Sequence, residues 1–183
     1  MICMYQPFIS IWIGEEYLLS NLCVVVFGVY FYVLKIGDIC FVYKEAMGMW
    51  WLDKMRCILE SATNLLLNIV LVKYIGVLGV LLSTIIAVTF ISIPWSINIL
   101  FKNFFRVSSK QYCIDQIVYA IDTAITVGVS YLLCSFVQEG GTVGFIEKFL
   151  VAISVSCISM FFLSRRKREY RQVKGFVKNY IKR

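Results

Sequence analysis

Two apolar segments joined by a very short turn constrain this chain most. Residues 77–93 contain no charged residue, and the turn 73–76 joins them to the apolar segment before it. Two helices joined by so few residues must pack as an antiparallel hairpin. After the turn, small residues recur at every fourth position, which is the spacing that lets membrane helices approach closely. The expected packing residues are Gly76, Gly79, Ser83 and Ala87.

The segment before the turn carries a polar residue at every third or fourth position. On an α-helix this spacing makes one continuous stripe, because residues three and four apart share a face. The stripe consists of Asp53, Arg56, Glu60, Asn64 and Asn68. Its other positions suit hydrocarbon, so we expect the stripe to face protein or water inside a helical bundle.

Two interpretations of this stripe are open. In the first, Arg56, Glu60, Asn64 and Asn68 line a hydrophilic cavity that binds a substrate. In the second, the charged residues lie at the membrane interface and the two asparagines bond to neighbouring helices, an interaction that contributes about 0.6 kcal/mol.

The composition indicates a membrane protein. Of the 183 residues, 60% are hydrophobic, whereas soluble domains average about 45–50% apolar residues. A spanning helix needs about 20 residues, and five apolar segments approach that length. They cover about residues 17–35, 56–73, 77–100, 116–136 and 145–163. We therefore predict an all-α integral membrane fold with five transmembrane helices, the third of which is bent by Pro94.

Domain boundaries follow from the same pattern. Residues 1–16 are expected to be the end of a missing span followed by an external turn, and residues 17–163 a five-helix transmembrane domain. Within that domain, the polar group at 35–38 is expected to end the first helix. Residues 37–55 are then expected to form a loop or an interfacial segment.

Positive charge predicts the orientation. Residues 164–183 carry nine Lys and Arg against one acid, whereas the rest of the chain carries nine against ten. Apolar residues also recur along one face of this segment, which predicts a basic amphipathic tail lying on anionic lipid. Because loops rich in Lys and Arg stay in the cytoplasm, we expect a multi-pass protein of the cell (inner or plasma) membrane. Its N-terminus is expected outside and its C-terminus inside.

Further candidate residues lie in the second half of the chain. Asp122 is an acid inside the fourth span, where it either couples transport to a cation or simply meets Thr123 or Thr126. Lys102 and Arg106 follow the third span, and they either gather an anionic headgroup or only orient the helix. The small residues expected to pack closely in the fourth span are Ala120, Ala124 and Gly128.

The sequence does not favour an enzyme. It contains no histidine, and its seven cysteines include no C-x-x-C pair, so neither a zinc site nor a disulfide framework is indicated. No glycine-rich phosphate loop or nucleophile–base pair is present. We expect no cofactor and no metal, and the basic charge favours a membrane surface over nucleic acid as partner.

Three stretches carry a family resemblance. They are Ile11-Trp12-Ile13-Gly14-Glu15-Glu16-Tyr17, Lys44-Glu45-Ala46-Met47-Gly48 and Val72-Lys73-Tyr74-Ile75-Gly76-Val77-Leu78-Gly79-Val80. Together with Asp53, Arg56, Asn64 and Leu65, they resemble the C-terminal half of polysaccharide flippases. These are the Wzx-type exporters of the multidrug/oligosaccharidyl-lipid/polysaccharide superfamily, and the resemblance covers about residues 7–106.

The resemblance implies a function. Its members translocate an undecaprenyl-pyrophosphate-linked glycan for O-antigen, capsule or a related polysaccharide, by alternating access of two helical bundles. Since they have 12 or 14 spans, this chain is expected to be their last five helices and to be inactive without a separate N-terminal half. A multidrug or cation antiporter fragment of the same superfamily is the alternative, as is a membrane remnant that transports nothing.

Overall fold

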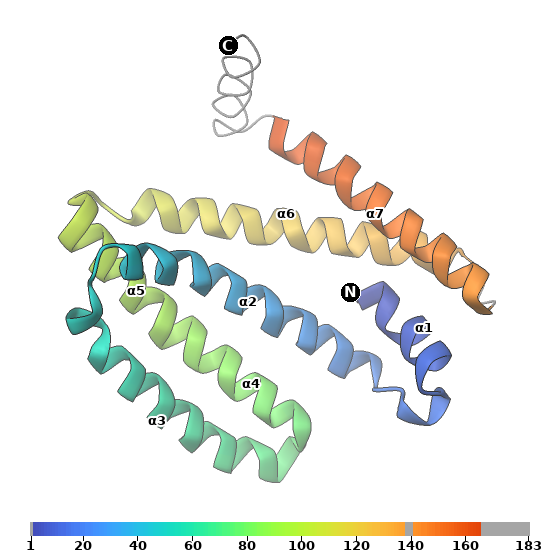
Figure 1. Cartoon of the computed structure of the whole chain (residues 1–183), viewed down its shortest axis with the longest axis horizontal. Coiled ribbons are helices and arrows are strands. Elements are labelled where there is room, and N and C mark those ends of the chain that lie inside the picture. Colours follow the sequence, from blue (N-terminus) through green and yellow to red (C-terminus); the bar gives the residue numbers. More distant parts are fainter. Residues whose placement is uncertain (1, 138–140, 166–183) are drawn as a thin grey trace. The chain divides into compact units, whose positions relative to one another are not determined.

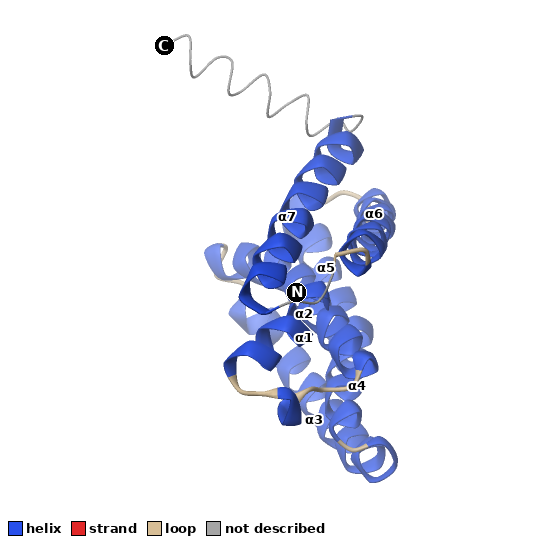
Figure 2. Ribbon diagram, turned by 90° about the vertical axis from the view of Figure 1, so that its right-hand side faces the viewer, coloured by secondary structure: helices blue, strands red, loops and turns tan. Residues whose placement is uncertain are grey.

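The computed structural model describes residues 2–137 and 141–165 of the chain, and the elements in this part are all helical (Figures 1 and 2). In order, they are α1 (Ile2–Trp12), the short η1 (Glu15–Tyr17), α2 (Asn21–Ala46), α3 (Trp50–Ile75), α4 (Val77–Ala87), η2 (Val88–Ser92), α5 (Ile93–Ile99), η3 (Leu100–Phe105), α6 (Lys110–Ser135) and α7 (Gly141–Arg165). Residues 166–183 of the expected amphipathic tail lie outside the described residues, as do residues 138–140 between the fourth and fifth expected spans.

Five of the described helices are long and apolar enough to cross a membrane. They are Asn21–Ala46, Trp50–Ile75, the continuous helix Val77–Phe105, Lys110–Ser135 and Gly144–Leu163. The predicted all-helical fold and the predicted number of such helices are confirmed on these grounds of length and composition.

The first two spans are longer than predicted. The expected break at 35–38 is absent, and α2 continues through Gly37 to Ala46. Lys35 and Asp38 pair on the helix surface, with 2.6 Å between the ammonium and a carboxylate oxygen, so the helix can continue through this polar group. The chain turns instead at 47–49, where Gly48 adopts a left-handed φ of 67°. Residues 37–55 are therefore mostly helical, so the prediction of a loop there was wrong. The alternative, an interfacial segment, stays a prediction.

The predicted hairpin joins α3 to α4 through one residue. Gly76 ends α3 and begins α4 with φ 58° and ψ −133°, a conformation that favours glycine. Beyond it, Gly79, Ser83 and Ala87 are the buried residues of α4. A Cβ added to Gly79 would lie 2.6 Å from the carbonyl carbon and oxygen of Leu71, so the two backbones are in direct contact there.

The helix 77–105 contains two π-helical segments, η2 and η3. Pro94 is the second residue after η2, and it has no backbone N–H for a normal helical hydrogen bond. The Ile93 N–H donates to the Val88 carbonyl, five residues back. The proline thus widens one turn of the helix, and the chain continues without interruption to Phe105, beyond the predicted end.

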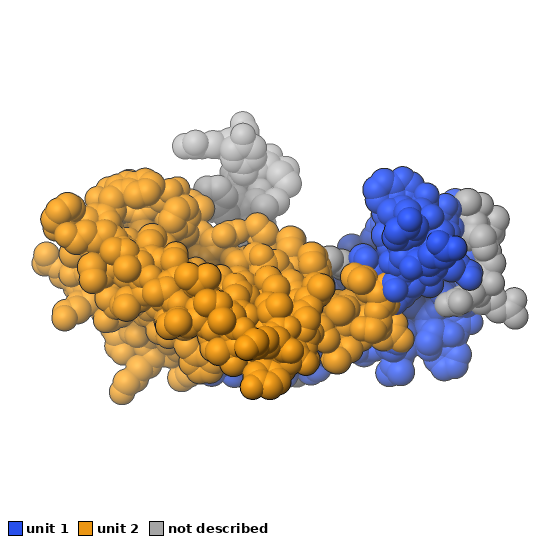
Figure 3. Space-filling model, turned by 90° about the horizontal axis from the view of Figure 1, so that it is seen from below, with its two compact units in different colours: residues 1–18, 115–183 blue, residues 19–114 orange. Residues whose placement is uncertain are grey.

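The chain forms two compact units (Figure 3). Unit 2 comprises residues 19–114 and contains α2, α3, the helix 77–105 and the first turn of α6. Unit 1 comprises residues 1–18 and 115–183. Within unit 1, α1 contacts α7, and the rings of Phe8 and Phe145 lie 6.1 Å apart.

Candidate functional site

A network of four charged side chains lies in the interior of unit 2. The Lys44 ammonium is 2.7 Å from one oxygen of Asp53. The Arg56 guanidinium binds both oxygens of the same carboxylate, with its Nε at 3.0 and 2.9 Å, and it also pairs with Glu60. Lys44, Asp53 and Arg56 are each at most 8% exposed as residues. The four groups carry two positive and two negative charges, so the network is neutral.

Two serines on the helix 77–105 complete this network. Lys44 donates to the Ser96 hydroxyl at 2.8 Å, and Arg56 donates to the Ser92 hydroxyl at 2.7 Å. The network therefore joins the end of α2, the start of α3 and the η2–α5 segment. Removing charges from water costs several kcal/mol per ion unless they are paired and hydrogen-bonded, and here both conditions are met.

Glu60 is the accessible edge of the network. Its side chain is 25% exposed, whereas the side chains of Lys44, Asp53 and Arg56 are 3 to 11% exposed. It has one ion-pair partner, Arg56, while Asp53 has two. Within the network, Glu60 is thus the group that a molecule from outside would reach first.

The stripe continues along α3 as a ladder of uncharged polar groups. Asn68 donates from its amide to the Asn64 carbonyl oxygen at 3.1 Å. From α4, the Ser83 hydroxyl donates to Asn68 at 2.5 Å and the Thr84 hydroxyl to Asn64 at 3.5 Å. Both asparagines therefore bond to the neighbouring helix, which is the second of the two interpretations considered for them.

These contacts show which way α3 faces. Its stripe residues are buried or half-buried, whereas its apolar residues Leu65, Leu66 and Ile69 are more than 60% exposed. The helix has its polar side toward protein and its apolar side outward, as a helix surrounded by lipid would. The orientation predicted for the stripe is the one observed.

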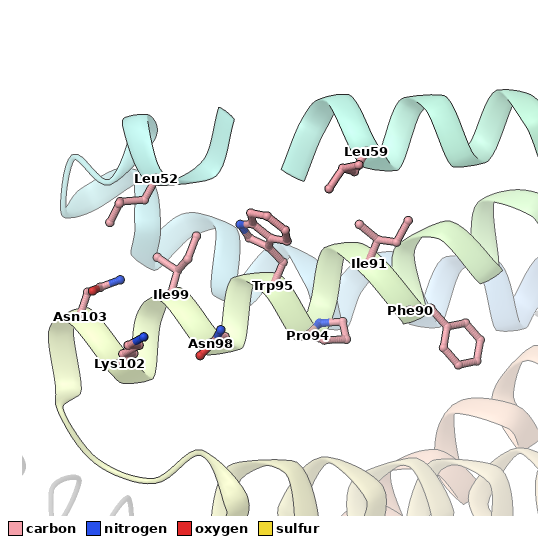
Figure 4. Close-up of a pocket in the computed structure, with 10 residues that line it drawn as sticks. All are labelled: Leu52, Leu59, Phe90, Ile91, Pro94, Trp95, Asn98, Ile99, Lys102 and Asn103. Atoms are coloured by element: carbon pink, nitrogen blue, oxygen red, sulfur yellow. The ribbon is translucent and has the colours of Figure 1, made fainter. Parts of the chain in front are cut away.

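A separate cavity of about 600 Å³ lies between α3 and the helix 77–105 (Figure 4). It is lined by Leu52, Leu59, Phe90, Ile91, Pro94, Trp95, Asn98, Ile99, Lys102 and Asn103. Of the seven candidate substrate-site residues named from the sequence, Lys102 alone lines this cavity. Arg56, Glu60, Asn64 and Asn68 are engaged in the polar contacts described above.

The remaining predicted residues lie elsewhere. Arg106 is exposed and ends the helix 77–105 with a left-handed φ of 52°. Asp122 is half-buried on α6 in unit 1, and the Thr126 hydroxyl donates to its backbone carbonyl at 2.9 Å. Thr123 donates to the Tyr119 carbonyl.

The small residues of α6 are more exposed to solvent than the small residues of α4, which are buried. Ala120 is half-buried and Ala124 is exposed. Gly128 is also exposed, and no heavy atom lies within 4 Å of a Cβ built on it.

Three members of the charged network were not predicted from the sequence: Lys44, Ser92 and Ser96. One signal was available for the serines, because they are four residues apart and so share a helix face. No local signal pairs Lys44 with Ser96, since they are 52 residues apart. Trp95, whose indole lines the cavity, was also missed.

The described residues define a class of protein. No group of three or more Cys, Asp or Glu side chains placed to hold a metal ion occurs in residues 2–137 and 141–165. Five long apolar helices and a neutral, buried ion network are features of multi-pass membrane proteins. Comparison of the chain with known protein families, curated proteins and solved structures found no match.

Proposed function

We propose that the chain forms part of a membrane translocator that flips a lipid-linked oligosaccharide repeat unit for polysaccharide synthesis. The observation that supports this most is the buried ion network, because it lies in helices long enough to cross a bilayer. Arg56 and Glu60 lie about two and three turns into α3, and charged side chains inside spanning helices are costly and mostly mark substrate or ion pathways. The resemblance of residues 7–106 to Wzx-type flippases supplies the substrate class, an undecaprenyl-pyrophosphate-linked glycan.

The proposed mechanism is an exchange of hydrogen bonds. In this structure the polar residues of α3 bond to α4, η2 and α5. When helical bundles move in alternating access, glycan hydroxyls take over some of these bonds. Glu60 accepts them at the accessible edge of the network, and the amides of Asn64 and Asn68 continue the path along α3. As the resemblance implies, a second helical bundle provides the opposite wall.

Binding of the glycan lipid to the purified chain tests this proposal. The chain is placed in nanodiscs and titrated with a fluorescent undecaprenyl-pyrophosphate oligosaccharide, in competition with undecaprenyl pyrophosphate that lacks the sugar. We expect saturable binding that the sugar-free lipid displaces poorly. Glu60→Gln should weaken binding roughly tenfold, because a hydrogen bond to a charged group contributes about 1.5–3 kcal/mol.

A matched control uses the same substitution elsewhere. Glu15 is an exposed acid on η1 in unit 1, so Glu15→Gln should leave the affinity unchanged. Equal affinities of the two variants, or no saturable binding at all, would contradict the proposal. A chain that binds no glycan lipid and moves no solute would be the non-transporting membrane protein considered above.

One observation favours the second candidate, a cation-coupled antiporter. Asp122 is a half-buried acid within α6, a helix apolar enough to span the membrane. A coupling role predicts that Asp122→Asn abolishes the dependence of transport on a proton or sodium gradient. Efflux of a cationic dye from loaded vesicles, measured with and without each gradient, separates this activity from glycan-lipid transport.

A further inference from the structure

We propose that the cavity between α3 and the helix 77–105 binds a membrane phospholipid whose headgroup is an anionic phosphodiester. This inference does not depend on the proposed transport function, because none of the residues in the ion network lines the cavity. It depends instead on the shape of the cavity, on the gradient of polarity along it and on the unpaired donors inside it.

The cavity is a groove along one helix. Its wall from the helix 77–105 consists of two rows of residues spaced four apart, 90/94/98/102 and 91/95/99/103, and such rows run side by side along a helix. Leu52 and Leu59 of α3 form the opposite wall (Figure 4). From residue 90 to residue 102 the helix rises about 18 Å, so the groove is long enough for a headgroup with part of an acyl chain.

Polarity changes from one end of the groove to the other. Phe90, Ile91 and Leu59 form an apolar end, whereas Asn98, Lys102 and Asn103 form a polar end. Within the polar end, Lys102 and Asn103 lie within one turn of Phe105, where the helix stops. The end of a spanning helix lies at the headgroup level of a bilayer, so this gradient matches a lipid with its phosphate near Lys102 and its chain toward Phe90.

The groove contains hydrogen-bond donors that the described chain leaves unpaired. The indole N–H of Trp95 is buried without a partner, and it lies toward the polar end in Figure 4. The side chains of Lys102, Asn98 and Asn103 make no hydrogen bond or ion pair with residues 2–137 or 141–165. Of these donors only the Trp95 N–H is buried, where a missing partner is costly, whereas Asn98, Lys102 and Asn103 are exposed and open to a ligand. Trp and Lys can only donate. A ligand rich in acceptor oxygens, such as a phosphodiester, satisfies all four groups.

Access and charge favour a phospholipid over other anions. Phe90 is 74% exposed and Leu52 is 47% exposed, so the groove is open along its side and a lipid can enter it from within the bilayer. Lys102 is the only charged residue among those that line the groove. One cation matches the single negative charge of a phosphodiester, whereas a pyrophosphate carries more charge than this site neutralises.

Quenching of Trp95 by brominated lipid tests the proposal. Trp12, Trp50 and Trp51 are each more than 60% exposed, so replacing them with Phe leaves Trp95 as the single fluorophore at little cost in stability. The full chain is reconstituted in vesicles that contain brominated phosphatidylglycerol or brominated phosphatidylcholine at the same mole fraction. A basic residue near the membrane surface contributes about 1 kcal/mol, which predicts a roughly fivefold preference for phosphatidylglycerol.

Two lysine variants separate the groove from general surface attraction. Lys102→Gln should abolish the preference. Lys54→Gln removes the same charge from an exposed position near the start of α3, outside the groove, and should leave the preference intact. Far-UV circular dichroism should show the same helix content in both variants, since both lysines are exposed.

A competition experiment identifies the lipid. Unlabelled phosphatidylglycerol should relieve the quenching by brominated phosphatidylglycerol, and undecaprenyl pyrophosphate at the same mole fraction should relieve it less. Equal quenching by the two brominated lipids would overturn the proposal, as would equal effects of Lys102→Gln and Lys54→Gln. Stronger displacement by undecaprenyl pyrophosphate would overturn the assignment to a phospholipid.

Discussion

Lys44 and Asp53 lie on different helices, and the lysine ammonium is 2.7 Å from the aspartate carboxylate in the interior of unit 2. The pair closes the turn between α2 and α3, and Arg56 and Ser96 bond to the same two groups. Both side chains are nearly excluded from solvent, at 3% and 11% exposure. Removing one partner of this pair should therefore lower the free energy of unfolding by more than removing one partner of a surface ion pair.

We predict that Lys44→Met strongly destabilises the chain. Removing one partner of a buried ion pair costs about 3–5 kcal/mol, and the lower end applies here because Arg56 still binds Asp53. Unfolding of the purified chain by sodium dodecyl sulfate, followed by circular dichroism, measures the change. Lys35→Met on the same helix is the control, because the Lys35–Asp38 pair is more than half exposed and contributes at most about 1 kcal/mol. Equal losses in the two variants would contradict the interpretation.

Gly79→Ala tests the close approach of α3 and α4. The new Cβ would lie 2.6 Å from backbone atoms of Leu71, so the hairpin must open, at a cost of about 1–3 kcal/mol. At Gly128 the same substitution meets no atom within 4 Å, and it should raise stability by up to about 1 kcal/mol through helix propensity. The thermal midpoints of the two variants in detergent should move in opposite directions. A shift of the same sign in both would show that contact with Leu71 does not limit this position.

Ser83→Ala tests the hydrogen bond between Ser83 and Asn68. Ser83 is fully buried and donates to Asn68 across the hairpin, so its loss should lower the free energy of unfolding by about 0.6–1.7 kcal/mol. Ser135→Ala is the control, because the Ser135 hydroxyl is exposed and bonds to the carbonyl of Leu132 in its own helix. The same unfolding titration measures both, and a larger loss for Ser135→Ala would refute the prediction.

Alkaline phosphatase fusions test the predicted orientation. The turn at 47–49 is flanked by Lys44, Lys54 and Arg56, and the turn at 106–109 by Lys102 and Lys110. Since loops rich in Lys and Arg stay in the cytoplasm, phosphatase fused in either turn should be inactive. Phosphatase fused after Gly76 should be active, and green fluorescent protein at the same three positions should show the opposite pattern. Phosphatase activity at 106–109 together with inactivity at Gly76 would show that the orientation is the reverse of the predicted one.

Much of the fold was predictable because it depends on local periodicity. Residues spaced three and four apart share a helix face in any surroundings. The spacing of the polar residues from Asp53 to Asn68 therefore predicted which face of α3 is turned toward protein. Gly76 predicted the turn between α3 and α4. The end of α2 was not predictable in this way, because the exposed pair Lys35–Asp38 has the composition of a loop and nevertheless lies within a helix.

The candidate site was only partly predictable, because its contacts join distant segments. The bond between Lys44 and Ser96 leaves no pattern within one helix, and the cavity beside Trp95 exists only because α3 supplies its second wall. By itself the sequence determined the helical class, the number of long apolar helices and the inward face of α3. Only the tertiary structure decided that the charged residues neutralise one another and that Lys102 faces a groove. A helix is specified by its own residues, whereas an ion pair or a cavity exists only where packing brings separate helices together.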